Sequence, residues 1–169
     1  DGIDAEALGL KLNERGGIAV DGRMKTNLPH IYAIGDVTGR VMLAHAAYAD
    51  ASVAVANILG RNEVSDTRIM PQCIYTYPML ASVGMTVSDA ERLGIPASVG
   101  MSDFRANGMA VAEGEEGCAF AVVDKRNGKN LGFTVVGASA CELIGTASIA
   151  VERGYTAEDW QHLTVAHPT

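Results

Sequence analysis

The sequence is short of cysteine, of positive charge and of long apolar runs, and each shortage excludes a class of protein. Its three cysteines, Cys73, Cys118 and Cys141, lie far apart and show no CxxC spacing. This pattern argues against a disulfide framework or a zinc site, so we expect all three to be reduced, small core residues. No run approaches the roughly 18 apolar residues of a membrane span. Because no basic and apolar leader begins the sequence, we expect a cytoplasmic protein.

Thirteen Lys and Arg residues stand against 20 Asp and Glu residues, which gives a net charge of −7. Such a charge argues against nucleic-acid binding, because that binding depends on neutralising phosphates. The sequence has no GxGxxG, P-loop or GxSxG motif, and its four histidines show no metal-ligand spacing, so we predict no metal site. With 48% apolar residues over 169 positions, the chain is globular and long enough for one core or two modest units.

The first 60 or so residues contain two short apolar runs and one apolar helix. Residues 18–20 predict a strand, and the unbroken run at residues 31–34 predicts a strand buried on both faces of a sheet. Residues 43–59 predict a helix that is buried on most sides, with Asp50 as its only formal charge and Gly60 at its end. One strand and its covering helix do not make a sheet, so this part is interpreted as the end of a larger α/β unit.

Beyond a charged connector, the pattern becomes that of an antiparallel sheet with helices. Strands are predicted in CIYTYP, LASVGM and PASVGMSDF, and a short helix in VSDAERLG. The runs CAFAVVD and LGFTVVG predict a hairpin, in which Asn127-Gly128 supplies residues with positive φ. The sequence therefore predicts an α+β protein with a domain boundary near residue 67.

Two helices are expected near the end of the sequence. Ser139 and Glu142 match a capping box, which would begin a helix that ends at Gly154. Thr156 is expected to cap the last, shorter helix. Together with the strands, these helices predict an antiparallel sheet with flanking helices in residues 68–169.

Gly35 and Asp36 follow the predicted strand at its carboxyl end, where open α/β sheets bind ligands. Gly35 would let the backbone approach a ligand, and Asp36 could accept from a sugar-like hydroxyl; alternatively, Asp36 is a turn residue that caps nearby amides. The following helix begins at residues 42–45, where N–H groups and partial positive charge would stabilise a ligand that becomes negative. The candidate residues there are Met42, Leu43, Ala44 and His45, although a lone histidine in a first turn is often a packed or capping residue.

His167 comes directly before Pro168, and a residue in that position is forced out of the α region. We therefore place His167 on an extended or turned segment after the last helix. An imidazole titrates near neutral pH and suits a proton shuttle. An ordinary surface histidine is the alternative.

Three stretches occur in order and at compatible distances: TNLPHIYAIGDVTGRVMLAHAA, IYTYPMLASVGMT and AHPT. With GKNLGFTVVGASACELI, they resemble the C-terminal part of the pyridine nucleotide-disulphide oxidoreductases over nearly the whole chain. The resemblance implies that residues 1–67 are the remnant of an FAD-binding domain. Residues 68–169 would be an interface domain, truncated at its C-terminus, that forms a homodimer. The family's FAD glycine motif, redox cysteines and NAD domain would precede residue 1.

The resemblance also implies roles for single residues. Asp36, after Gly35, would hydrogen-bond FAD near its ribityl chain, and the amides at residues 43–45 would face the flavin. His167, in a cis bond to Pro168, would exchange protons with the redox thiols of the partner subunit. A glutamate that orients this histidine in the family would lie beyond Thr169.

The resemblance is greatest to the members that oxidise dihydrolipoamide with NAD as acceptor, on the lipoyl domain of a 2-oxoacid dehydrogenase complex. The 169-residue chain by itself is expected to be inactive and to bind neither FAD nor NAD. Other members of the family act on glutathione-type disulfides, mercuric ion or nicotinamide nucleotides by transhydrogenation, and these stay open as alternatives. A non-catalytic dimerisation module is the alternative from another class.

Overall fold

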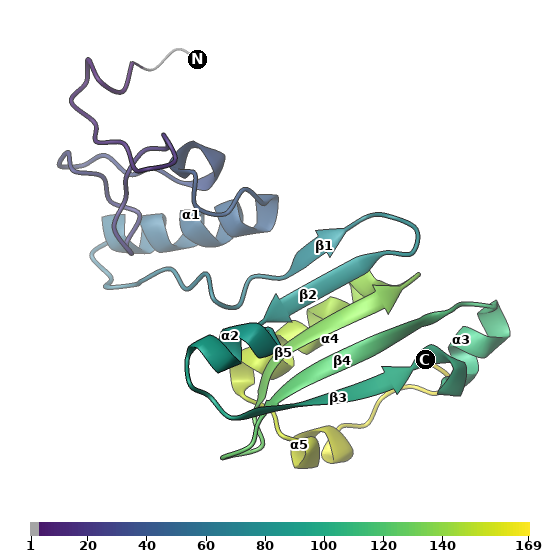
Figure 1. Cartoon of the computed structure of the whole chain (residues 1–169). Coiled ribbons are helices and arrows are strands. Elements are labelled where there is room, and N and C mark those ends of the chain that lie inside the picture. The colour runs from purple at the N-terminus through teal and green to yellow at the C-terminus, as the bar shows by residue number, and fades with distance from the viewer. Residues whose placement is uncertain (1–3) are drawn as a thin grey trace. The chain divides into compact units, whose positions relative to one another are not determined.

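The structure is a computed structural model that describes residues 4–169 (Figure 1). These residues divide into two compact units, and the chain passes from one to the other between Thr67 and Arg68. No helix in this described range has both the length and the apolar character to cross a membrane. The first unit holds η1 (Gly35–Thr38) and α1 (Ala44–Ile58). The second unit holds, in chain order, β1 (Gln72–Ile74), β2 (Leu80–Gly84), α2 (Val87–Arg92), β3 (Ala97–Asp103), η2 (Phe104–Ala106), α3 (Gly108–Glu113), β4 (Gly117–Asp124), β5 (Asn130–Gly137), α4 (Ala140–Arg153) and α5 (Ala157–His162).

The two strands predicted in the first unit do not form as regular strands. Each region contributes only one isolated antiparallel bridge, Leu12 with Ile18 and Lys25 with Tyr32. A strand is stable only when a neighbour pairs with it along its length, and the described residues of this unit provide no such neighbour. A small apolar cluster of Leu10, Ile18 and Ala33 forms there instead.

Helix α1 confirms the helix predicted at residues 43–59. It ends in a Schellman motif: Gly60 has φ +81°, its N–H donates to the Asn57 carbonyl at 3.1 Å, and the Arg61 N–H donates to the Ala56 carbonyl at 2.9 Å. Within this unit only one side of the helix is buried, and burial on most sides, expected for a larger α/β unit, stays a prediction. The buried positions, which include Ala46 and Ala54, lie on one side, whereas large apolar side chains elsewhere on the helix are exposed.

The second unit is built on a five-stranded antiparallel sheet in the order β1-β2-β5-β4-β3. Residues that lie directly opposite one another on paired strands share a face of the sheet. Cys73 of β1, Ala81 of β2, Val135 of β5 and Ala119 of β4 form such a row. Ala81 and Val135 belong to the buried core, so this row faces the interior of the unit.

Helix α4 covers that face of the sheet (Figure 1). Ala140, Ile144 and Ala147 of this helix are buried in one cluster with Ala81 and Val135. The helix ends at Gly154, as predicted, with φ +65°. This cluster is the main apolar core of the described residues.

The predicted capping box at Ser139 and Glu142 is wrong, because the Ser139 side chain makes no capping hydrogen bond. Its ψ of 19° departs from the extended conformation that aims an N-cap hydroxyl at the third amide. Thr86 and Thr156 have extended backbones, with ψ of 168° and 174°, and both form complete capping boxes, the first at α2 and the second at α5. The expected role of Thr156 is therefore confirmed.

Strands β4 and β5 form the predicted hairpin, but its turn is held differently from the prediction. Only Gly128 of the Asn127-Gly128 pair has positive φ, at +73°. The buried carboxylate of Asp124 accepts hydrogen bonds from the Arg126 backbone N–H at 2.9 Å and from its guanidinium at 2.7 Å. These bonds hold the pKa of Asp124 at about 2, below its ordinary value of 3.8.

The only tryptophan of the sequence fixes α5 to the sheet. The Trp160 ring meets the Phe133 ring of β5 edge to face, with centroids 6.0 Å apart, and the Tyr155 ring at 5.9 Å. The Asn130 side chain donates to the Tyr155 carbonyl at 2.6 Å. The short helix before the last seven residues is therefore held by aromatic packing and one buried amide.

Candidate functional site

Gly35 turns the chain into η1, at the place where the sequence predicted a ligand-binding edge. Its φ of +70° is in the left-handed region, and a Cβ atom there would lie 3.1 Å from the Ala47 Cβ atom. Both the backbone conformation and the close approach of α1 therefore favour glycine. The fully buried Thr38 hydroxyl donates to the Gly35 carbonyl at 2.7 Å and closes this turn.

Asp36 is the first residue after that glycine and its side chain is exposed. Its backbone carbonyl accepts from the Gly39 N–H at 2.9 Å, so the backbone, and not the carboxylate, closes the turn. An exposed carboxylate in this position can accept hydrogen bonds from a hydroxyl-bearing ligand. The structure therefore does not support the capping alternative, and the ligand role of Asp36 stays a prediction.

The start of α1 presents no capping side chain. Leu43 is the N-cap, with an extended backbone, and its own N–H donates to the Val41 carbonyl at 3.0 Å. Met42 is 72% exposed, and the side chains of Ala44 and His45 are exposed as well. The first-turn N–H groups and the partial positive charge of the helix therefore lie beside an accessible surface, although the Leu43 amide is bonded within the turn.

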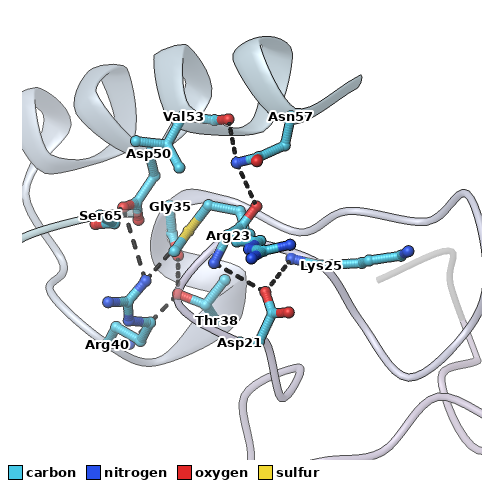
Figure 2. A network of polar contacts seen from close by, with 11 residues as sticks. Asp21, Arg23, Lys25, Gly35, Thr38, Arg40, Asp50, Val53, Asn57 and Ser65 are labelled. Carbon is cyan, nitrogen blue, oxygen red and sulfur yellow. Dashed lines mark hydrogen bonds and ion pairs between the residues drawn. The ribbon is translucent and has the colours of Figure 1, made fainter. Parts of the chain in front are cut away.

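A polar network lies beneath this surface and fixes the connection between η1 and α1 (Figure 2). Asp50 of α1 is 5% exposed, and its Oδ1 accepts from the Ser65 hydroxyl at 2.8 Å. Arg40 Nη1 lies 3.8 Å from the same oxygen and 3.1 Å from the Met24 sulfur. Because Arg40 lies between η1 and α1, this ion pair holds the turn at η1 and the start of α1 together.

Sequence reasoning did not predict this network. The sequence did carry one indication of it: Asp50 is the single charge on an otherwise apolar helix, and burying a charge costs free energy unless it is paired. Asn57, the second-last residue of α1, extends the network: its side-chain amide donates to the Val53 carbonyl at 2.8 Å (Figure 2). The same amide donates to the Glu63 carbonyl at 2.8 Å. These bonds fix the segment that carries Ser65 against α1.

His167 lies in the second unit, after α5, on a segment without helix or strand. Its side chain is exposed, and its peptide bond to Pro168 is cis, as the resemblance implied. The Thr169 carbonyl accepts from the Asn107 side-chain amide at 2.9 Å. The end of the described chain is thereby attached to the residues around α3.

A pocket of about 500 Å³ opens beside that attachment. Helix α3, which the sequence analysis did not predict, forms one side of it. The signals were present at both ends of α3: the Asn107 side chain accepts from the Ala110 N–H at 3.0 Å, and Gly114 has φ +71°. The pocket is lined by Phe104, Asn107, Met109, Ala110, Glu113, Glu115, Ala138, Ser139, Leu143, Pro168 and Thr169.

Across residues 4–169, no three His, Cys, Asp or Glu side chains lie close enough together to hold a metal ion. The candidate chemistry is therefore that of two surfaces, each described within its own unit: the turn and helix start at residues 35–45, and the segment that carries His167.

Family models match almost the entire chain. Residues 70–169 match the dimerisation domain of the pyridine nucleotide-disulphide oxidoreductases, and residues 1–51 match a second model of the pyridine nucleotide-disulphide oxidoreductases. The dihydrolipoyl dehydrogenase of Chlorobaculum tepidum is 43% identical over 171 residues, and that of Bacillus subtilis is 36% identical over 170 residues. Both alignments cover 100% of this chain, but only 36% and 37% of those relatives.

Solved structures also match over the whole chain, and the chain again covers only part of each matched protein. LpdA from Mycobacterium tuberculosis matches with a TM-score of 0.92 and 26% identity, over 100% of this chain and 37% of that protein. The HOCl-induced flavoprotein disulfide reductase RclA from Escherichia coli matches with a TM-score of 0.90 and 26% identity, over 100% of this chain and 40% of that protein. The chain thus spans little more than a third of the length of the proteins that it matches.

Proposed function

Because the chain belongs to the pyridine nucleotide-disulphide oxidoreductase family, we propose that it is the C-terminal part of a dihydrolipoyl dehydrogenase. The full-length enzyme would oxidise dihydrolipoamide to lipoamide with NAD as acceptor. The observation that carries this proposal is the match over the whole chain to relatives of that name, at up to 43% identity. The isolated chain, which corresponds to 36% of such a relative, would be inactive and would retain neither cofactor.

The residues at the η1–α1 surface fit one side of an FAD site. Gly35 lets the backbone approach, and the exposed Asp36 carboxylate would accept from the ribityl hydroxyls. The first turn of α1, at Met42, Leu43, Ala44 and His45, would place partial positive charge beside the isoalloxazine edge that becomes negative on reduction. FAD supplies the electron relay between dithiol and NAD. The chain's own part is to hold and polarise it.

His167 would move the proton in this reaction. A thiol attacks a disulfide as its thiolate, so dihydrolipoamide has to lose a proton as it attacks. The His167 imidazole would take that proton and return it to the leaving thiol. Its exposed position on the segment after α5 supports access to a substrate from outside the unit.

We assign residues 1–67 to the remnant of the FAD-binding domain and residues 68–169 to the interface domain of a homodimer. Support for the second assignment comes from the dimerisation-domain match over residues 70–169. It also comes from α4, on which Leu143 and Ile149 are 44% and 54% exposed. In the dimer, the thiols that His167 serves would belong to the partner subunit. The enzyme would work in the cytoplasm, on the lipoyl domain of a 2-oxoacid dehydrogenase complex.

A flavoprotein disulfide reductase with another substrate is the second candidate, and the structural match to RclA supports it. One measurement separates the two: a full-length flavoprotein that carries this chain is purified and assayed for NAD reduction with dihydrolipoamide. Parallel assays offer NADH or NADPH with oxidised glutathione or Hg(II). We expect turnover with dihydrolipoamide alone. A protein with stoichiometric FAD that turns over glutathione disulfide but not dihydrolipoamide would reject our assignment.

A further inference from the structure

Two cysteines from distant parts of the chain meet under the edge of the sheet. Cys73 pairs with Ala81, and Ala81 pairs with Val135, so the Cys73 side chain lies on the face that α4 covers. Cys141 stands in the first turn of α4, and α4 contacts β1. Both cysteines are half-buried and pack against the same core cluster. The fold therefore brings residues 73 and 141 together, although 68 positions separate them in the sequence.

The two thiols are also near neighbours. Partial burial raises the pKa of Cys141 first, and the nearby Cys73 thiol raises it further. Both cysteines are free in this structure, so the pair is a dithiol. Because both side chains pack against the same cluster and α4 contacts β1, a disulfide between them would join two elements that the fold already places side by side.

We propose that Cys73 and Cys141 are a redox-sensitive modification site, which a small-molecule disulfide converts to a reversible intramolecular disulfide. One cysteine thiolate attacks a sulfur of the reagent, forms a mixed disulfide and releases the first reagent thiol. The second cysteine thiolate then attacks the protein sulfur of that mixed disulfide and releases the second reagent thiol. Two protein thiols are oxidised, the reagent disulfide is reduced to two thiols, and the two cysteine protons end on the released thiols.

The third cysteine is excluded by its place in the sheet. Cys118 precedes Ala119 on β4, and successive side chains of a strand point to opposite faces. Ala119 is in the row that faces α4, so Cys118 faces away from it. The proposed disulfide would fasten the three-residue edge strand β1 to α4, and Cys118 offers a control of the same chemistry on the other face.

The test treats the 169-residue chain with excess oxidised glutathione, blocks the remaining thiols with iodoacetamide and maps peptides without reduction. We expect the intact protein to lose two hydrogens, one cross-linked peptide pair that contains Cys73 and Cys141, and alkylation of Cys118 alone. Dithiothreitol should return all three thiols. Cys118→Ser should leave the cross-link unchanged, whereas Cys73→Ser and Cys141→Ser should abolish it and leave a glutathione adduct on the remaining partner.

Each variant is first compared with the wild type by circular dichroism to check that it folds. The unfolding midpoint is a second readout, which does not require the Cys73→Ser and Cys141→Ser variants. Oxidation should raise the unfolding midpoint of the wild type and of Cys118→Ser, measured in the same samples. Three alkylated cysteines after oxidation, glutathione adducts without a cross-link in the wild type, or a cross-link that involves Cys118 would each overturn the proposal.

Discussion

Arg40 and Asp50 form an ion pair at 3.8 Å, in which the Asp50 side chain is almost fully buried and the Arg40 side chain is 26% exposed. The pair joins the connection after η1 to the middle of α1. Asp50 lies outside the proposed FAD surface at residues 35–45, yet this ion pair makes the position of that surface depend on it.

We predict that Asp50→Ala destabilises the chain by about 1–3 kcal/mol, because it leaves the Ser65 hydroxyl without its acceptor and Arg40 without its counter-ion. Urea unfolding followed by circular dichroism measures this. Glu14→Ala, which removes a carboxylate from an exposed position, is the matched control and should stay within about 0.5 kcal/mol of the wild type. Equal effects of the two substitutions would show that the Asp50 network does not stabilise the unit.

Gly35→Ala is expected to cost more than the same change at Gly16. Both glycines have positive φ, +70° and +76°, so an alanine pays about 1–2 kcal/mol in either place. Only at Gly35 does the new methyl group meet a neighbour, the Ala47 Cβ atom at 3.1 Å, while nothing lies within 4 Å at Gly16. The difference between the two unfolding free energies isolates the contact with α1. No difference would mean that α1 moves away without cost.

The Asp124–Arg126 bonds predict a pH dependence of stability. The folded pKa of Asp124, about 2, is below its ordinary value of 3.8. The stabilisation is therefore complete above the unfolded pKa and is lost as the pH falls from about 4 through about 2. Arg126→Ala should flatten that loss in unfolding experiments at successive pH values. Lys125→Ala removes a positive charge from the same turn and should keep the wild-type slope; a flattened slope there too would point to net charge rather than to the hydrogen bonds.

His167→Gln tests the proposed proton shuttle in a full-length flavoprotein that carries this chain. General acid–base help is worth about 10²–10⁴-fold, so flavin reduction by dihydrolipoamide should slow by that order. Flavin reduction by NADH involves no thiol and should hardly change. Stopped-flow absorbance measures the two half-reactions separately. If both slow equally, or if neither slows, His167 is a structural residue.

The homodimer proposal predicts self-association of residues 68–169 through α4. Sedimentation at tens of micromolar protein should detect a dimer, since a standard interface of about 1,600 Å² holds in that range. Ile149→Asp places a charge on the exposed side of α4 and should shift the equilibrium towards monomer. Leu93→Asp adds the same charge at an exposed position after α2 and should not. A wild-type chain that sediments as a monomer would count against the proposal.

The elements that sequence reasoning predicted well are those whose ends carry their own chemistry. Helix α1 ends at Gly60 and α5 begins at Thr156 because a left-handed glycine and an extended threonine satisfy backbone groups locally. The hairpin follows from two alternating runs around Gly128. Such signals need no partner elsewhere in the chain.

The predictions that were wrong concern features that depend on tertiary partners or on backbone conformation. The run at residues 31–34 has strand composition, but a strand requires a neighbour, and the described residues supply only one bridge at Tyr32. Ser139 is a residue type that commonly caps helices, but its backbone conformation prevents capping. The partners of Asp50 and the proximity of Cys73 to Cys141 are tertiary, and spacing along the sequence does not indicate either.

The edge-to-face packing of Trp160 on Phe133 and Tyr155 has a practical consequence for spectroscopy. Because the sequence contains a single tryptophan, the tryptophan fluorescence of the chain, excited selectively over its tyrosines, comes from one site on the short helix that leads to His167. Emission wavelength and quenching by iodide therefore report whether this last helix is seated on the sheet. The signal requires no label, and it can follow the segment that carries His167 in real time, in the chain alone or when a partner is added.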